Sequence, residues 1–448
     1  MSNPPGPKTP ILWQVINWIV SPLSYLEQCA RNYGDVFTTP LGNKCAPLIC
    51  VSDPQSLELI LSRDRQELST PGDANEFTEP VLGTQSLVTL SGARHQRQRQ
   101  LMMPPFHGDR MKAYGNAIVE ITQTVIREWS TKQTIEVRPA MQRISLQVIL
   151  RTVFGLSTAS RYCQLEALLT QMLDAFSHRL SVALLYFPNL SGLGGSMGPW
   201  QTFLNQKVMV DQLIYEEIRD RRLNPDFSRT DILHLLMEAR DDQGEALTDE
   251  ELHDELMALL VGGREAIATA MSWAFYWVAK HPEVKAQLTT ELDTWRGNQD
   301  PLEVLKLPYL TAVCNETLRI YPPGMLTFPR RVETPIKIRG YLLKPGTLLT
   351  GCIYLAHQRE STYPDAKTFC PQRFLDHKFS PYEFLPFGGG SRRCIGLAFA
   401  QFEMKLVLAT IMSQLDFALM DHRPAQPMRR GVTLASTPIR IRVISQQP

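Results

Sequence analysis

The stretch LPFGGGSRRCIG, residues 385 to 396, places three consecutive glycines and two arginines beside one cysteine. Glycines accept backbone conformations with positive φ, which can turn peptide N–H groups toward a neighbouring anion. Positive charge on Arg392 and Arg393 is expected to lower the pKa of the Cys394 thiol. The apolar run LAFAQFEMKLVLATIMSQL follows at once and predicts a buried helix whose N-terminal dipole points at the cysteine. The local pattern therefore indicates a stabilised thiolate at residue 394.

Three roles compete for Cys394. A structural, buried cysteine would not require the glycines or the arginines. A covalent nucleophile would require a histidine base, which folding would have to supply from His357 or His95. A single thiolate ligand to haem fits all the local features, because haem carries propionates that need cations such as Arg392 and an apolar face that needs Phe387.

This stretch resembles the haem-binding loop of the cytochromes P-450, whose pattern is F-x-x-G-x-R-x-C-x-G. The pattern is met at five fixed positions, which are Phe387, Gly390, Arg392, Cys394 and Gly396. The resemblance implies haem b as cofactor and Cys394 as the ligand of its iron. It also implies that Phe387, Arg392 and Gly396 contact the cofactor.

Two further segments resemble motifs of that family. NETLRIYPP carries Glu316 and Arg319 in the E-x-x-R pattern, and PQRFL carries Arg373. By itself E-x-x-R is an ordinary i, i+3 ion pair on a helix. The resemblance implies that the three side chains form a buried structural triad, in which two guanidinium groups allow one carboxylate to be buried.

A second group of residues is expected to bind the haem propionates. In GARHQRQRQLMMPPF, His95 and Arg99 lie one helical turn apart on the same face, where the family places its propionate ligands. Without the resemblance, the same segment would be interpreted as a solvated basic face. A third cation is expected from FPRRVETPIKIRGY, with Arg330 favoured over Arg331.

The pattern of apolar residues predicts a mainly helical chain with a small β portion. Helical spacing dominates from about residue 110 to 295, and strand-like segments lie at residues 35–42, 46–52, 334–355 and 436–445. Thr248 and Glu251 predict a capping box that opens a helix of about 30 residues, which ends at His281–Pro282. The resemblance implies the cytochrome P-450 fold, a triangular helical prism around a buried haem, formed by residues 1–448 as a single domain.

Composition excludes several classes of protein. The chain has 46 Lys plus Arg against 45 Asp plus Glu, so no global charge favours nucleic acid. None of the eight cysteines forms a C-x-x-C pair, which favours a reducing compartment. The proline-rich segment 1–20 holds an apolar run too short to span a bilayer. These features predict a cytoplasmic protein without an integral membrane anchor.

The middle of the long helix departs from the family pattern. It contains Gly262-Gly263-Arg264-Glu265, but Ala266 stands where the family usually has the threonine associated with proton delivery to oxygen. Thr269 lies about one turn further along the same face. Three accounts remain open: Glu265 delivers protons with water or a substrate hydroxyl, the enzyme uses peroxide, or the reaction does not cleave dioxygen.

The resemblance implies a monooxygenase that hydroxylates or epoxidises an apolar substrate, such as a fatty acid, terpenoid or polycyclic compound, with O2. Electrons would come from a separate ferredoxin or flavodoxin, docked on a basic face formed by Arg94, Arg97, Arg393 and Lys405. Two alternatives are a haem-thiolate peroxygenase, isomerase or dehydratase without a reductase, and a non-catalytic haem sensor or carrier. The expected substrate pocket consists of Phe77, Leu82, Leu87, Phe176, Leu184, Ala258, Gly262, Leu326, Phe328 and Leu434.

Overall fold

The computed structural model describes residues 3–64, 66–106, 110–155, 160–177, 199–295 and 300–446. Helices account for most of this part of the chain. Their bounds are α1 Ile11–Val20, α2 Pro22–Tyr33, α3 Pro54–Ser62, α4 Glu79–Leu82, α5 Gly92–Met102, α6 Arg110–Arg127, α7 Val137–Phe154, α8 Ser160–Phe176, α10 Pro199–Leu223, α11 Ile232–Glu238, α12 Asp249–Lys280, α13 Pro282–Asp293, α14 Pro308–Ile320, α15 Ile353–His357, α16 Arg373–Asp376 and α17 Leu397–Gln414.

The strands are short and form small sheets. Their bounds are β1 Val36–Thr39, β2 Leu48–Val51, β3 Leu68–Ser69, β4 Thr134–Glu136, β5 Arg330–Val332, β6 Ile336–Ile338, β7 Tyr341–Leu343, β8 Leu348–Gly351, β9 Leu415–Leu419, β10 Pro427–Arg430, β11 Thr433–Ser436 and β12 Arg440–Gln446. The largest sheet has the order β1-β2-β8-β5-β3, and only its β2–β8 pair is parallel. The predicted mainly α chain with a small β portion is confirmed.

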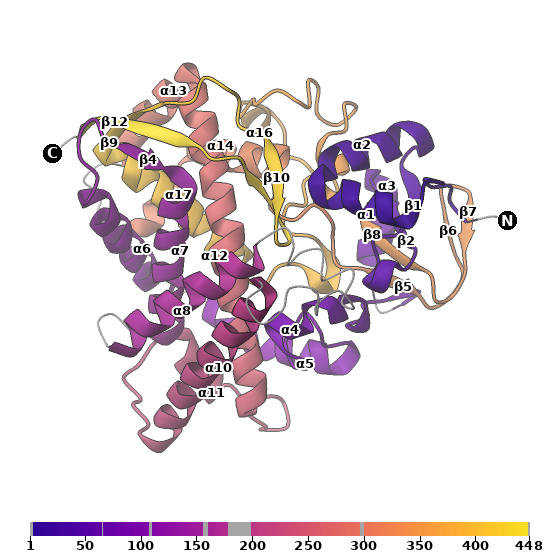
Figure 1. The fold of residues 1–448 in the computed structure, drawn as a ribbon, viewed down its shortest axis with the longest axis horizontal. Coiled ribbons are helices and arrows are strands. Elements are labelled where there is room, and N and C mark those ends of the chain that lie inside the picture. Colours follow the sequence, from indigo (N-terminus) through magenta and orange to yellow (C-terminus); the bar gives the residue numbers. More distant parts are fainter. Residues whose placement is uncertain are drawn as a thin grey trace.

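The long helix α12 crosses the middle of the molecule (Figure 1). Its N-terminus has the predicted capping box, in which Thr248 and Glu251 exchange side-chain and backbone hydrogen bonds. Pro282 opens α13 directly after His281, so α12 ends where the sequence indicated. Helices α7, α14 and α17 pack against α12. In Figure 1 the sheet that contains β1 and β2 lies on one side of α12, and α6, α7 and α8 lie on the other.

The segment 1–20 contains a helix that lies against the fold. One side of α1 is buried through residues such as Val15 and Trp18, and Arg429 of β10 lies 4.7 Å from the Trp18 ring centroid. Among the described residues, no helix combines the length and the hydropathy that crossing a membrane requires.

Glu316, Arg319 and Arg373 meet in the interior. The Arg319 guanidinium donates to both Glu316 carboxylate oxygens, at 2.6 and 2.8 Å, and Arg373 Nε donates to Glu316 Oε1 at 3.1 Å. The spare donors of Arg319 bind the carbonyl oxygens of His357 and Ala366. Glu316 and Arg319 are completely buried, so this network ties α14 to α15 and α16 without access to solvent.

Replacing Arg319 by Met should destabilise the fold strongly, because it leaves the buried Glu316 carboxylate with one cation fewer. Breaking a buried ion pair typically costs about 3–5 kcal/mol. The free energy of unfolding, measured by urea titration, should fall by that amount. Arg63→Ala is the control, since the Arg63–Glu67 pair is partly exposed and should contribute less than about 1 kcal/mol. Equal losses in the two variants would contradict the structural role of the triad.

Candidate functional site

The loop that carries Cys394 is a tight turn directly before α17. Gly388 and Gly390 have φ of +67° and +66°, a conformation that residues with a Cβ adopt only under strain. The Cys394 N–H donates to the Phe387 carbonyl oxygen at 3.0 Å and closes the turn. A Cβ built on Gly390 would lie 2.3 Å from Asp64 Oδ2 and 2.6 Å from the Leu61 carbonyl oxygen. The loop therefore needs glycine at residue 390 for both its backbone conformation and its close packing.

Asp64 and Arg330 hold the loop from the side of α3. Asp64 Oδ2 accepts from the Ser391 N–H at 2.8 Å and from the Ser391 hydroxyl at 2.9 Å. Its other oxygen accepts from Arg330 Nε. Arg330 is completely buried and donates in turn to the Gly389 carbonyl oxygen at 2.8 Å. One carboxylate and one guanidinium thus hold Gly389 and Ser391, the two residues that flank Gly390, and sequence reasoning did not identify Asp64.

His357 holds the start of the loop. Its Nε2 accepts from the Leu385 N–H at 3.0 Å, and the ring stacks on Phe384. Burial lowers the pKa of His357 to about 3, with the nearby Arg319 charge acting in the same direction. A neutral ring whose lone pair already accepts a hydrogen bond cannot act as the base for a cysteine nucleophile, so the structure gives His357 a supporting role.

Cys394 is exposed and lies three residues before the start of α17. Burial raises the pKa of the thiol, and the Gly396 N–H and the charges of Arg99 and Arg393 oppose that effect. The expected lowering of this pKa is wrong in its net direction, because burial outweighs the charge of Arg393, which does act as expected. The Arg392 guanidinium donates to the carbonyl oxygens of Thr70, Leu87 and Leu90.

Cations gather beside the cysteine loop. Burial, together with the charges of Arg330 and Arg99, lowers the pKa of Arg392 to about 10, and the Asp64 carboxylate opposes this effect. His95 is buried one turn before Arg99 on α5. Arg331, the alternative to Arg330, instead pairs with Asp73 at the surface. Arg392, Arg330 and Arg99 carry three positive charges, and Asp64 carries the one negative charge that acts on Arg392. This net positive charge suits an anionic ligand.

A stripe of small residues runs along the middle of α12. Gly262 is exposed, and Ala258 and Ala266, one turn away on either side, are partly exposed, whereas Arg264 and Glu265 beside them are buried. A Cβ built on Gly262 would contact nothing within 4 Å. This face of the helix is flat and apolar, which suits a planar ring or an apolar ligand lying against the backbone.

Glu265 and Thr269 point toward α7. The Glu265 carboxylate accepts from Arg138 at 2.6 Å, from Arg264 at 2.7 Å and from Gln142 at 2.9 Å. Arg138 also donates to the Thr269 hydroxyl at 3.0 Å. Neither side chain therefore lies on the face that carries Ala266. Their predicted catalytic role stays a prediction, and the structure adds Arg138 as the residue that joins them.

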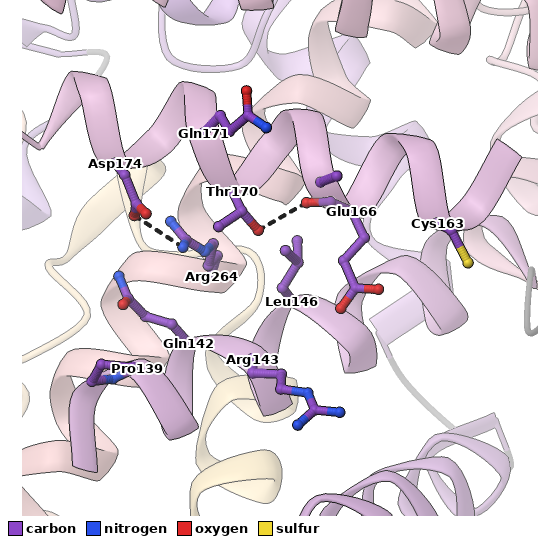
Figure 2. Close-up of a pocket in the computed structure, with 11 residues that line it drawn as sticks. Pro139, Gln142, Arg143, Leu146, Cys163, Glu166, Thr170, Gln171, Asp174 and Arg264 are labelled. Atoms are coloured by element: carbon purple, nitrogen blue, oxygen red, sulfur yellow. Dashed lines mark hydrogen bonds and ion pairs between the residues drawn. The ribbon is translucent and has the colours of Figure 1, made fainter. Parts of the chain in front are cut away.

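This network reaches a groove between α7 and α8. Arg264 donates to Asp174 at 3.1 Å, and both residues line the groove, whose volume is about 580 Å³ (Figure 2). The Asp174 carboxylate is largely exposed, so a chain of hydrogen bonds connects solvent to Glu265 through Arg264. Figure 2 also shows Gln142 on the α7 wall of the groove.

The predicted pocket residues divide into two groups. Phe77, Leu87, Ala258, Gly262, Leu326 and Phe328 are at least partly exposed. Leu82, Phe176 and Leu434 are buried, and Leu434 packs with Trp18 and Leu26 in a separate apolar cluster. Leu184 lies outside the described residues. The first group is therefore accessible and the second is not, and the substrate contacts predicted for these residues stay predictions.

The predicted basic docking face is wrong at Lys405, and at Arg97 it is weakened by ion pairs. Lys405 is 7% exposed because it lies on α17, whose apolar surroundings bury it. Arg97 pairs with Asp241 and Glu251, which are far from it in the sequence. Arg393 and Arg94 are exposed. The surface charge near the loop is therefore smaller than the sequence suggested.

The chain is similar to proteins of one family over nearly its whole length. The sequence profile described as Cytochrome P450 matches residues 4–443. Cytochrome P450 135B1 of Mycobacterium tuberculosis is 33% identical over 97% of this chain and 89% of its own length. Cytochrome P450 135A1 of the same species is 32% identical over 96% of this chain and 92% of its own length. Neither name states a substrate.

Two solved structures share the fold. The structure of the retinoic acid bound cyanobacterial CYP120A1 has a TM-score of 0.84 at 22% identity, and the match covers 100% of this chain and 100% of the other. The haem domain of cytochrome P450DA has a TM-score of 0.85 at 21% identity, covering 100% of this chain and 98% of the other. The cytochrome P-450 fold expected from the sequence is thereby confirmed.

The cofactor of this family is haem b, and the residues described above fit it. Cys394 has the side chain that ligates the iron of thiolate-haem proteins. Arg392 and Arg99 carry positive charge that would suit two propionates, and the small-residue stripe of α12 would suit the flat apolar ring; these contacts stay predictions. Arg330 donates to Asp64 and to the loop, and its predicted contact with a propionate stays a prediction.

Gly390→Ala should reduce haem incorporation strongly, because the added methyl group would displace Asp64 or Leu61 and move the loop. Haem per protein can be measured by pyridine haemochrome absorbance after expression. Gly388→Ala is the matched control: it has the same positive φ, but its Cβ would contact nothing within 4 Å. It should suffer only the backbone strain, about 1 kcal/mol. Equal haem content in both variants would contradict the proposed packing of Gly390.

Proposed function

Because the chain belongs to the cytochrome P450 family, we propose that it hydroxylates or epoxidises an apolar small molecule with O2. The observation that carries this proposal is the Cys394 loop, which Asp64, Arg330 and His357 hold beside a cluster of cations. A fatty acid, terpenoid or polycyclic compound suits the partly exposed apolar residues on the α12 side of the site.

The chain's own residues position and shield the reactants. Haem, when bound, would supply the activation of oxygen, and the Cys394 thiolate would be its iron ligand from the protein. Arg392, Arg99 and His95 would hold the propionates. Leu87, Leu326 and Phe328 would contact the substrate and exclude water, while Gly262 and Ala258 leave room for it beside α12.

Proton supply is proposed to involve Glu265. The Glu265 carboxylate is the acid nearest in sequence to Ala266, and Gln142 and Arg264, which donate to it, line the open groove, so water in the groove would have to bring the proton because the Arg264 guanidinium cannot relay one. Water or a substrate hydroxyl would have to carry the proton past Ala266, because a methyl group cannot donate one. Thr269 is a second candidate, because its hydroxyl accepts from Arg138 and keeps its own proton to donate.

Electrons are proposed to come from a separate ferredoxin or flavodoxin. The exposed Arg393, adjacent to Cys394, and Arg94 on α5 are the two predicted docking residues that remain at the surface. Long-range attraction between such cations and an acidic partner would speed association more than it would tighten binding.

A peroxygenase, isomerase or dehydratase that needs no reductase is the second candidate. Ala266 favours it, because peroxide chemistry and oxygen-free reactions do not depend on the missing alcohol. A threonine at residue 266 would remove the reason for considering this alternative.

The two candidates differ in what they consume. The purified haem protein would be incubated with a panel of apolar substrates under three conditions: a ferredoxin and its reductase with ¹⁸O2, hydrogen peroxide alone, and anaerobic buffer. The proposal predicts product that carries one ¹⁸O atom and forms only with the reductase system. Turnover under either of the other conditions alone would favour the second candidate.

Ala266→Thr should raise the fraction of reducing equivalents recovered as product if proton supply limits the reaction. We expect an increase of about twofold or more, a small part of the ~10²-fold that a positioned acid or base typically contributes. Ala266→Val is the matched control, because it adds the same bulk without a hydroxyl. The ratio of product to NAD(P)H consumed measures the effect, and an equal change in both variants would attribute it to shape instead of proton transfer.

A further inference from the structure

The buried His253 ring lies between two aspartates on different helices. Its Nδ1 is 2.9 Å from Asp254 Oδ1 on α12, and its Nε2 is 3.1 Å from Asp211 Oδ1 on α10. The Tyr215 ring stacks on the imidazole at 4.4 Å with an interplanar angle of 3°. The ring is 4% exposed, the hydrogen bond to Asp254 is buried and the one to Asp211 is partly buried.

This geometry determines the charge of His253. An ionised carboxylate only accepts hydrogen bonds, and a neutral imidazole has a single N–H to donate. Only the imidazolium can donate to both aspartates at once. Loss of its proton would leave one ring nitrogen lone pair facing a carboxylate oxygen and would break the contact on one side, either with α10 or with Asp254.

The same part of α12 also binds the segment 83–87. Asp254 Oδ2 accepts from the Gln85 N–H at 2.8 Å, and Glu255 Oε1 accepts from the Leu87 N–H at 2.7 Å. Gly83, with φ of +77°, packs so closely that a Cβ would lie 2.1 Å from the Asp254 carboxylate. Three successive residues of α12 therefore join α10 on one side and segment 83–87 on the other.

Segment 83–87 connects this junction to the site. It includes Leu87, a partly exposed residue of the predicted pocket, whose carbonyl oxygen accepts from Arg392 of the cysteine loop. A shift of the segment would therefore move a pocket residue and a hydrogen-bond partner of Arg392 together.

We propose that His253 is a positioning residue that acts as a proton-dependent latch, holding α10 and segment 83–87 against α12 beside the substrate. That this side of the molecule binds substrate rests on the proposed function. The latch itself rests on the His253, Asp211 and Asp254 contacts.

The direction of the pH dependence follows from the groups around the ring. Burial alone would lower the pKa of His253, but the hydrogen bonds and charges of Asp211 and Asp254 outweigh it and raise the pKa above 6.5. Lys207 of α10 also faces Asp211, at 2.6 Å, and Tyr215 covers the ring. A raised pKa means that the latch is complete below pH 6.5 and is lost as pH rises through the folded-state pKa.

The pKa of Glu255, like that of His253, is raised above its ordinary value. Burial raises its pKa to about 8, although hydrogen bonds from Gln98 and the Leu87 N–H oppose that effect. Deprotonation of Glu255 in alkaline solution would place a charge next to the Asp254 and Glu251 carboxylates. Variants of His253 are therefore needed to separate the two groups.

The first test measures the titration of His253 in the full-length haem protein by histidine NMR, with His253→Gln used to assign the signal. The latch predicts a pKa above 6.5 that falls in Asp211→Asn. A His253 signal that titrates at or below 6.5, or that is unchanged in Asp211→Asn, would overturn the proposal. This measurement requires no substrate.

The second test measures function. The dissociation constant of a substrate that shifts the haem spectrum should rise about fivefold or more between about pH 6 and pH 9, at the low end of typical couplings between sites. Hydrogen exchange in α10 and segment 83–87, corrected for the intrinsic rate, should increase over the same range. In His253→Gln, the dissociation constant and the hydrogen exchange should both depend less on pH than in the parent protein. In His281→Gln, a substitution at the other end of α12, both should keep the pH dependence of the parent protein.

The outcomes separate the latch from the proposed function. If no substrate shifts the spectrum but exchange in both segments depends on His253 and pH, the latch stands and the proposed function fails. If substrates bind with the same pH dependence in His253→Gln as in the parent protein, the latch fails and the proposed function stands.

Discussion

The contact between Asp64 and the cysteine loop is the constraint on which the rest of the site depends. One carboxylate accepts hydrogen bonds from the backbone and hydroxyl of Ser391 and, at the same time, from Arg330, which binds the Gly389 carbonyl oxygen. This arrangement is possible only because residue 390 has no side chain. It fixes Cys394 at the start of α17, with Arg99 on a neighbouring helix close enough to influence its thiol.

Local sequence patterns predicted the elements of the fold well. The capping box at Thr248, the glycine-rich turn and the apolar run of α17 each depend on residues close together in the chain, so their physical signals are present in the sequence. The meeting of Glu316, Arg319 and Arg373 could be inferred only through resemblance, because Arg373 lies more than fifty residues beyond its partner. Helical spacing alone would have placed Glu316 and Arg319 at the surface.

The destinations of long polar side chains could not be predicted in the same way. Arg97 is partly exposed and pairs with Asp241 and Glu251, and the side chain of Lys405 on α17 is buried, so Lys405 cannot contribute to a docking face. Asp64 and His357 carry no motif that distinguishes them from other acids and histidines, and they gain their roles only when α3 and α15 are brought against the loop. Such contacts depend on tertiary packing, which outweighs any tendency visible in one segment.

Helix α12 has three separate roles in the proposed site. The small-residue stripe of α12 leaves space for a ligand, Glu265 of α12 accepts hydrogen bonds from α7, and the first turns of α12 bind α10 and segment 83–87. The most direct test of the whole account is the absorption spectrum of the reduced protein with carbon monoxide. Ligation by the Cys394 thiolate predicts the red-shifted Soret band typical of thiolate-ligated haem, and this band should be lost in Cys394→Ala. A band at the position of imidazole-ligated haem, or a colourless protein, would contradict the account.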